Sequence, residues 1–122
     1  MTASHNRSIG QKGESIAAAY LEENGYIIID RNYRTPHGEI DLIAAKGEVI
    51  TFVEVKTRTS NSLGPPEISI TSRKIEHMRN AAEYFIQQHP EMTNDWRIDV
   101  ITIQLKSNQS VPIVDHFENV DT

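Results

Sequence analysis

Two acids and a lysine in the middle of the chain, Asp41, Glu54 and Lys56, have the types and spacing that could do chemistry. Glu54 and Lys56 lie two residues apart in a run rich in strand-forming residues, so both side chains fall on one face, about 7 Å apart. Asp41 lies in the preceding run, and a reversal near Gly47 would place it across from Glu54. Two facing carboxylates repel each other unless one is protonated or a cation binds between them.

This arrangement predicts metal-assisted hydrolysis of a phosphodiester. Carboxylate oxygens are hard ligands that favour Mg²⁺ or Mn²⁺, and Mg²⁺ commonly binds through one or two carboxylates together with water and substrate phosphate. We expect Asp41 and Glu54 to be metal ligands, and Lys56 to position the attacking water or to stabilise developing charge. Taken singly, each residue is better explained as an ordinary strand carboxylate or a surface ion pair. Only the combination favours a metal site.

A fourth candidate, Glu14, comes from a predicted helix over residues 11–24. Ala17, Ala18 and Leu21 repeat at helical spacing and form its buried stripe, and Glu14 falls on the same stripe. A carboxylate on an inward face needs a partner. We therefore expect Glu14 to be a catalytic residue as well, which completes the acidic shell as a third metal ligand or holds a metal-bound water.

Four basic residues are candidates for contacts with nucleic acid: Arg34, Arg58, Arg73 and Lys74. Arg58 extends the strand face of Glu54, and Arg34 could act through its charge. Arg73 and Lys74 fall in the first turn of a predicted helix, where the helix dipole disfavours a cation by about 0.3–1 kcal/mol. For these two residues, phosphate contact and an ordinary solvated surface stay open as interpretations.

Other polar residues have mainly structural interpretations. Asp99 alternates with Ile98 and Val100 in an apolar run, which predicts a buried, hydrogen-bonded carboxylate. Glu39 shares the face of Asp41 at the strand entry, and a role in the site or on the surface stays open. The five histidines lack the spacing of a zinc site, and without cysteine the chain has no disulfide, thiolate metal site or cysteine nucleophile.

The elements that must position these residues are predicted from periodicity and turn residues. Gly25 is placed to end the first helix, and Pro90 prevents a second helix from continuing. Prolines and glycines also mark tight reversals, so three strands should form an antiparallel meander. The expected strands span residues 26–34, 39–44, 48–58 and 96–105, the second helix spans 71–89, residues 59–66 form a loop, and 113–117 is a possible short strand.

The resulting order, α-β-β-β-α-β with a possible last strand, predicts an α/β fold with a mixed sheet flanked by helices. A chain of 122 residues fits a single domain, with its core at about residues 8–105 and a polar tail. The net charge of −5 argues against nonspecific coating of nucleic acid. Residues 107–122 hold three acidic and no basic residues, so the rest of the chain is less negative than this net charge indicates. Neither an apolar leader nor a bilayer-length apolar run is present, so we expect a cytoplasmic protein without a membrane partner.

The motifs around these residues resemble a known family. Asp41, together with the later run Glu54-Val55-Lys56, is similar to the acid and (D/E)-x-K signature of the restriction-endonuclease-like superfamily. The wider match is to the bacterial YraN family of predicted endonucleases, over about Ser8 to Ile103. It is carried by Gly13-Glu14, Gly25-Tyr26, Arg31-Asn32-Tyr33-Arg34, Gly38-Glu39-Ile40-Asp41-Leu42-Ile43-Ala44, Phe52-Val53-Glu54-Val55-Lys56-Thr57-Arg58 and Arg97-Ile98-Asp99-Val100.

The resemblance implies a restriction-endonuclease-like core and a metal-dependent endonuclease acting on DNA, with branched or damaged DNA as one option. The implied arrangement is similar to that of archaeal Holliday-junction resolvases, whose dimeric state makes a homodimer one option. Two other functions stay open: a non-catalytic module that binds nucleic acid or protein on the same fold, and a purely structural dimerisation role. Stoichiometric metal binding that depends on Glu54 would favour the enzyme.

Overall fold

The structure is a computed structural model that describes residues 2–59, 70–92, 95–105 and 111–121, with side chains from Ser8 onward. Two helices and five strands follow one another in the expected order, and the short last strand is present. They are α1 (Thr2–Glu23), β1 (Ile27–Thr35), β2 (Gly38–Lys46), β3 (Val49–Arg58), α2 (Ser72–Gln88), β4 (Asp95–Gln104) and β5 (Ile113–Phe117). In the described part of the chain, no helix is long and apolar enough to cross a membrane.

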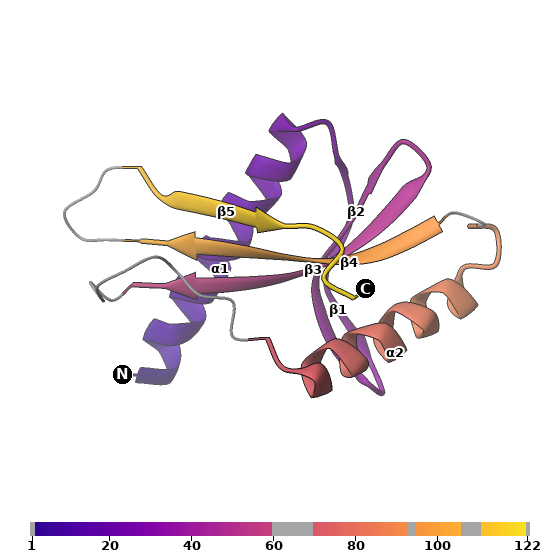
Figure 1. Ribbon diagram of the computed structural model, residues 1–122. Coiled ribbons are helices and arrows are strands. Elements are labelled where there is room, and N and C mark those ends of the chain that lie inside the picture. Colours follow the sequence, from indigo (N-terminus) through magenta and orange to yellow (C-terminus); the bar gives the residue numbers. More distant parts are fainter. Residues whose placement is uncertain (1, 60–69, 93–94, 106–110, 122) are drawn as a thin grey trace.

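All five strands form one mixed sheet in the order β1-β2-β3-β4-β5. β1, β2 and β3 pair antiparallel, which confirms the predicted meander. β3 and β4 pair parallel, and β5 returns antiparallel to β4. A parallel pair requires a crossover connection, and α2 lies in this connection between β3 and β4 (Figure 1).

The helices cover opposite faces of the sheet, and each face has its own hydrophobic cluster. Side-chain alternation along β3 separates them, because Val53 packs toward α1 whereas Phe52 packs toward α2. The α1 cluster contains Ala17, Ala18, Leu21, Tyr26, Leu42, Ala44, Val53, Ile101 and Ile103. The α2 cluster contains Ile40, Ile43, Ile50, Phe52, Ala81, Ala82 and Phe85.

Helix α1 is longer than the sequence indicates, since it begins at Thr2 and not near Gln11. Residues 2–10 are mostly polar and carry no apolar stripe, so helical periodicity does not detect them. The helix ends as predicted, with Gly25 in the left-handed region at φ 89°. Its buried face is the predicted stripe.

Helix α2 agrees with its prediction to within one residue at each end. Thr71 is the N-cap, and its side chain accepts the backbone N–H of Lys74 at 3.1 Å. His89 is the C-cap and directly precedes Pro90. The loop expected over residues 59–66 lies, from Ser60 onward, outside the described residues.

Candidate active site

Asp41 and Glu54 face each other across β2 and β3. The antiparallel pairing of these strands reaches Leu42 opposite Val53, so the next residues along are Asp41 and Glu54. At this point Oδ2 of Asp41 accepts the backbone N–H of Val55 at 2.8 Å. The two carboxyl groups also lie within hydrogen-bonding reach of each other. The juxtaposition expected from the sequence is therefore present, and we call these two residues the acidic pair.

The surroundings of Asp41 in the acidic pair disfavour its charged form. Burial of Asp41 and then the negative charge of Glu54 raise the pKa of Asp41 to about 7. The charge of Glu14 raises that pKa further, whereas the Val55 N–H lowers it. Such a carboxyl binds a proton or a cation. Its oxygen donors are those that Mg²⁺ and Mn²⁺ prefer, so the residues present fit such an ion.

Glu14 approaches the acidic pair from α1. The preceding residue, Gly13, lies so close to β3 that a Cβ there would collide with the side chain of Thr57. Burial raises the pKa of Glu14, and the charges of Glu39 and Glu54 raise it too. In the described part of the chain, however, no group of three or more His, Cys, Asp or Glu side chains could hold a metal ion. Glu14 is thus coupled to the acidic pair through its charge.

Lys56 and Arg58 continue the face of β3 that carries Glu54, and all three side chains are partly exposed. Figure 1 shows this end of β3 extending past the first turn of α2, so the helix leaves it uncovered. The carbonyl of Arg58 accepts the backbone N–H of Leu105 at 2.7 Å, which anchors the strand end beside β4. The predicted row of an acid, an amine and a guanidinium is therefore present.

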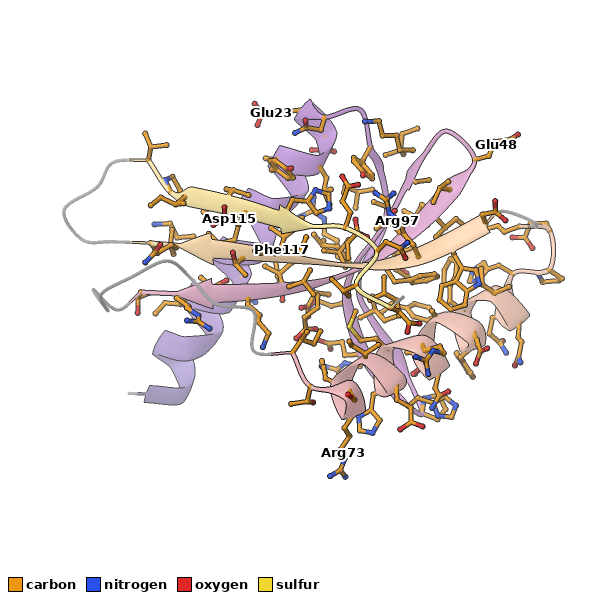
Figure 2. All side chains as sticks on the ribbon, viewed as in Figure 1. Glu23, Glu48, Arg73, Arg97, Asp115 and Phe117 are labelled. Atoms are coloured by element: carbon orange, nitrogen blue, oxygen red, sulfur yellow. The ribbon has the colours of Figure 1, made fainter. Side chains whose placement is uncertain are left out.

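Of the two cations at the start of α2, only Lys74 reaches the acidic pair. Its Nζ lies 3.6 Å from Oε1 of Glu54, whose side chain is only 14% exposed. Capping by Thr71 begins the helix at the point where Lys74 can make this contact. Arg73 is exposed and points away from the body of the protein (Figure 2).

Comparison with known protein families matches the segment that contains these residues. A family model described as Uncharacterised protein family UPF0102 matches residues 13–103, a range that contains Glu14, the acidic pair and Lys56. The chain belongs to this family. A UPF0102 protein of Geobacter metallireducens is 43% identical over 94% of this chain and 93% of its own length. UPF0102 proteins of Moorella thermoacetica and Syntrophomonas wolfei are 42% and 41% identical over 91% and 86% of this chain, respectively.

In this UPF0102 chain, Arg34 on β1 pairs with Glu39 on β2. Its Nε is 3.3 Å from Oε2 of Glu39, and its side chain is 88% exposed. Both residues line an open pocket of about 460 Å³, together with Gly10, Gln11, Glu14 and Asn32. The sequence left open whether Glu39 belongs to the site or to the surface. In the structure Glu39 is exposed and lines the same pocket as Glu14.

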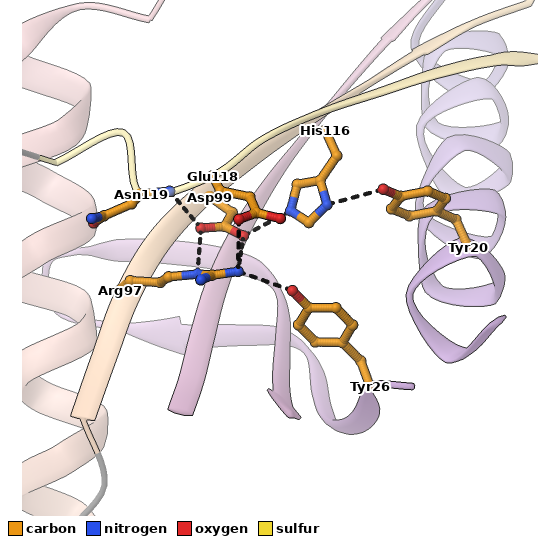
Figure 3. Close-up of polar contacts among 7 residues, drawn as sticks. All are labelled: Tyr20, Tyr26, Arg97, Asp99, His116, Glu118 and Asn119. Atoms are coloured by element: carbon orange, nitrogen blue, oxygen red, sulfur yellow. Dashed lines mark hydrogen bonds and ion pairs between the residues drawn. The ribbon is translucent and has the colours of Figure 1, made fainter. Parts of the chain in front are cut away.

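A second polar cluster in this UPF0102 chain surrounds Asp99 and lies among α1, β4 and β5 (Figure 3). Asp99 is fully buried, as predicted. It accepts the backbone N–H of Asn119 at 2.9 Å, and it contacts Nε2 of His116 at 2.7 Å and Nε of Arg97 at 3.1 Å. Nδ1 of His116 in turn contacts the Tyr20 hydroxyl at 3.1 Å.

Sequence reasoning did not single out Asn32, Arg97 or His116 as parts of these polar groups. Asn32 lies within hydrogen-bonding reach of Glu14. The available signal for Asn32 was its place in an expected strand, because asparagine is depleted in strands. Arg97 lies two residues from Asp99 on the same face of β4, a local signal that could have found it. His116 reaches Asp99 from β5, so no local signal marked it in the sequence of this UPF0102 chain.

Proposed function

We propose that this protein is a divalent-metal-dependent endonuclease that hydrolyses phosphodiester bonds in DNA. One observation carries the proposal: Asp41 is partly buried against Glu54, and its pKa is raised to about 7 by that burial and by the neighbouring charge. Perturbed carboxyls with an adjacent amine are typical of functional sites. The (D/E)-x-K pattern and the mixed sheet are in keeping with a restriction-endonuclease-like core.

Asp41 and Glu54 would hold Mg²⁺ or Mn²⁺, and Glu14, which does not form a group of three with them, would hold a metal-bound water molecule. When bound, such an ion lowers the pKa of water and stabilises negative charge on phosphate oxygens. Lys56 donates from the same strand face and neutralises charge on the phosphate that enters the site. The Val55 N–H keeps the Asp41 carboxylate oriented toward Glu54.

The basic residues around the site would bind the DNA backbone, which carries the sequence-independent part of the affinity. Arg58 extends the row of Glu54 and Lys56, and Lys74 is held beside Glu54. Arg34 and Arg73 are exposed, so both can meet a DNA backbone that extends beyond the site. Branched or damaged DNA is the substrate class that the family resemblance implies, so four-way junctions belong in the assay.

Cleavage assays with matched variants test this function. Linear duplex, single-stranded and four-way DNA are incubated with Mg²⁺ or Mn²⁺ and with wild type, Asp41→Asn or Lys56→Ala protein. We expect both variants to lose at least about 100-fold of the wild-type rate. Glu23→Gln, which changes an exposed carboxylate at the end of α1, is the control and should retain full activity. Equal activity of all four proteins would reject the assignment.

A non-catalytic binding module is the second candidate, and the contact between Lys74 and Glu54 favours it. This ion pair places a cation of the chain itself beside the acidic pair, 3.6 Å from Oε1 of Glu54. Calorimetric titration with Mn²⁺ separates the two candidates. Stoichiometric binding that Glu54→Ala abolishes favours the enzyme, whereas metal-independent binding of DNA or of a protein favours the module.

A further inference from the structure

Asn32 occupies the position in β1 that faces Asp41. β1 and β2 pair through Arg31 with Leu42 and through Tyr33 with Ile40, so Asn32 and Asp41 fall opposite each other between these pairs. Asn32 therefore belongs to the same row across the sheet as the acidic pair.

The backbone of Asn32 is left-handed, with φ 51°. In the described part of the chain, Asn119 at φ 53° is the only other non-glycine residue with a positive φ. A left-handed residue inside a strand interrupts side-chain alternation, so its side chain can leave the direction of its neighbours. Such conformations cluster at functional sites, where the surrounding structure holds them.

Asn32 is exposed, and its amide acts on Glu14 as a hydrogen-bond donor that lowers the pKa of this carboxyl, against the larger opposing effect of burial. An amide N–H that donates to a carboxylate holds that carboxylate in one orientation. Asn32 and Glu14 also line the same open pocket of about 460 Å³. The left-handed residue of β1 and the partly exposed carboxylate of α1 thus line the same pocket.

We propose that Asn32 is a positioning residue, whose left-handed backbone directs its amide to Glu14 and so orients this carboxylate toward the acidic pair. The inference rests on the proposed metal-dependent function and adds a residue to its site. Asn32 acts through Glu14 and not through the substrate, so its loss changes the reaction rate and metal affinity more than DNA binding. Residues that orient metal-site carboxylates typically contribute about 10- to 100-fold in metal affinity or activity.

If Asn32 served only to tolerate the left-handed backbone, Asn32→Gly would leave kcat and Mn²⁺ affinity unchanged. Glycine adopts φ near 51° more readily than asparagine, so Asn32→Gly keeps the backbone and removes only the amide. Asn119→Gly is the matched control, because Asn119 has a similar φ of 53° and its contact with Asp99 is through the backbone N–H, which glycine keeps. Thermal unfolding of both variants reports whether the fold is intact.

The experiment is a double-mutant cycle of wild type, Asn32→Gly, Glu14→Ala and the double variant, with Asn119→Gly as the control. We expect Asn32→Gly to lower kcat on DNA about 10-fold with little change in KM, and to weaken Mn²⁺ binding in calorimetry by a similar factor. We expect the double variant to be no worse than Glu14→Ala, because Asn32 has no carboxylate left to orient. Asn119→Gly should match wild type in kcat and in Mn²⁺ affinity.

Two results would overturn the positioning role while the proposed function stands. One is wild-type kcat and Mn²⁺ affinity in Asn32→Gly while Asp41→Asn is inactive. The other is independent effects that multiply in the double variant. A wild-type protein that neither binds Mn²⁺ nor cleaves DNA overturns both the proposed function and the role of Asn32.

Discussion

Asp41 and Asp99 are two inward-facing carboxylates on the same sheet, with opposite surroundings. Asp99 has a guanidinium, an imidazole and a backbone N–H within 2.7–3.1 Å. Asp41 accepts one backbone N–H, and the charges that act most on its pKa are those of the acids Glu54 and Glu14. A buried carboxylate whose charge is satisfied by the chain holds the fold together, whereas one left short of positive charge is available for a ligand.

The largest expected effect concerns Asp99. Asp99→Asn removes the buried charge that Arg97 and His116 face, and it leaves the partly buried guanidinium with the more exposed Glu118, whose Oε1 lies 3.6 Å from Nη2. We expect the free energy of unfolding to fall by about 3 kcal/mol, as measured by urea denaturation at pH 7.5. A loss below about 1 kcal/mol would mean that the Asp99 cluster is less important for stability than its burial suggests.

Metal binding should stabilise the folded protein only when the Asp41 carboxylate is present. Mn²⁺ at about 100 times its dissociation constant stabilises the folded protein by about 2.7 kcal/mol, because it binds the native state. We expect a rise in Tm of several degrees at pH 8 in wild type and in Glu23→Gln, and none in Asp41→Asn, in thermal scans. A rise of equal size in all three proteins would show that the ion binds elsewhere.

Asp41→Asn should raise stability in the absence of metal, in contrast to Asp99→Asn. At pH 8 the wild-type carboxyl is ionised against Glu54, whereas the amide is neutral and its oxygen still accepts the Val55 N–H. We expect a gain of about 1–3 kcal/mol in the free energy of unfolding at pH 8.

The pH dependence of that gain follows from the direction of the Asp41 pKa shift. The folded pKa of about 7 lies above the ordinary 3.8, so the folded protein binds a proton that the unfolded chain releases between these values. The contribution of Asp41 to the free energy of unfolding of the wild type is therefore fully present below pH 4, and it is lost as the pH rises through 7. Urea denaturation between pH 4 and 8 should show the gain of Asp41→Asn disappearing toward pH 4; a gain independent of pH would contradict this origin.

The smallest expected effect concerns Lys74, whose Nζ lies 3.6 Å from Oε1 of Glu54. The Lys74 side chain is 40% exposed, so its ion pair with Glu54 is screened by water. We expect Lys74→Met to change the free energy of unfolding by less than about 1 kcal/mol. Arg34→Met, which removes a more exposed ion pair, is the control. A loss of several kcal/mol in Lys74→Met would mean that the acidic pair is already satisfied by the chain, and would favour the non-catalytic module.

Local patterns in the sequence are sufficient for most of the fold and for the acidic pair. Residue alternation sets the faces of β3, and glycine turns set the hairpin register, so the amino-acid pattern alone predicts Asp41 opposite Glu54. The start of α1 could not be placed, because residues 2–10 have no apolar stripe. The family resemblance pointed to a wider set of residues but did not show what each of them contacts.

By itself, the sequence determined the order of the elements, the antiparallel meander and the row of Asp41, Glu54 and Lys56, because these depend on spacings within one strand or one hairpin. Only the tertiary structure decided how each charge is compensated. Lys74 reaches Glu54 from another helix, Asn32 reaches Glu14 from another element, and His116 meets Asp99 across β4 and β5. The free energy of a buried carboxylate depends on such neighbours, which are distant in the chain and adjacent only after folding.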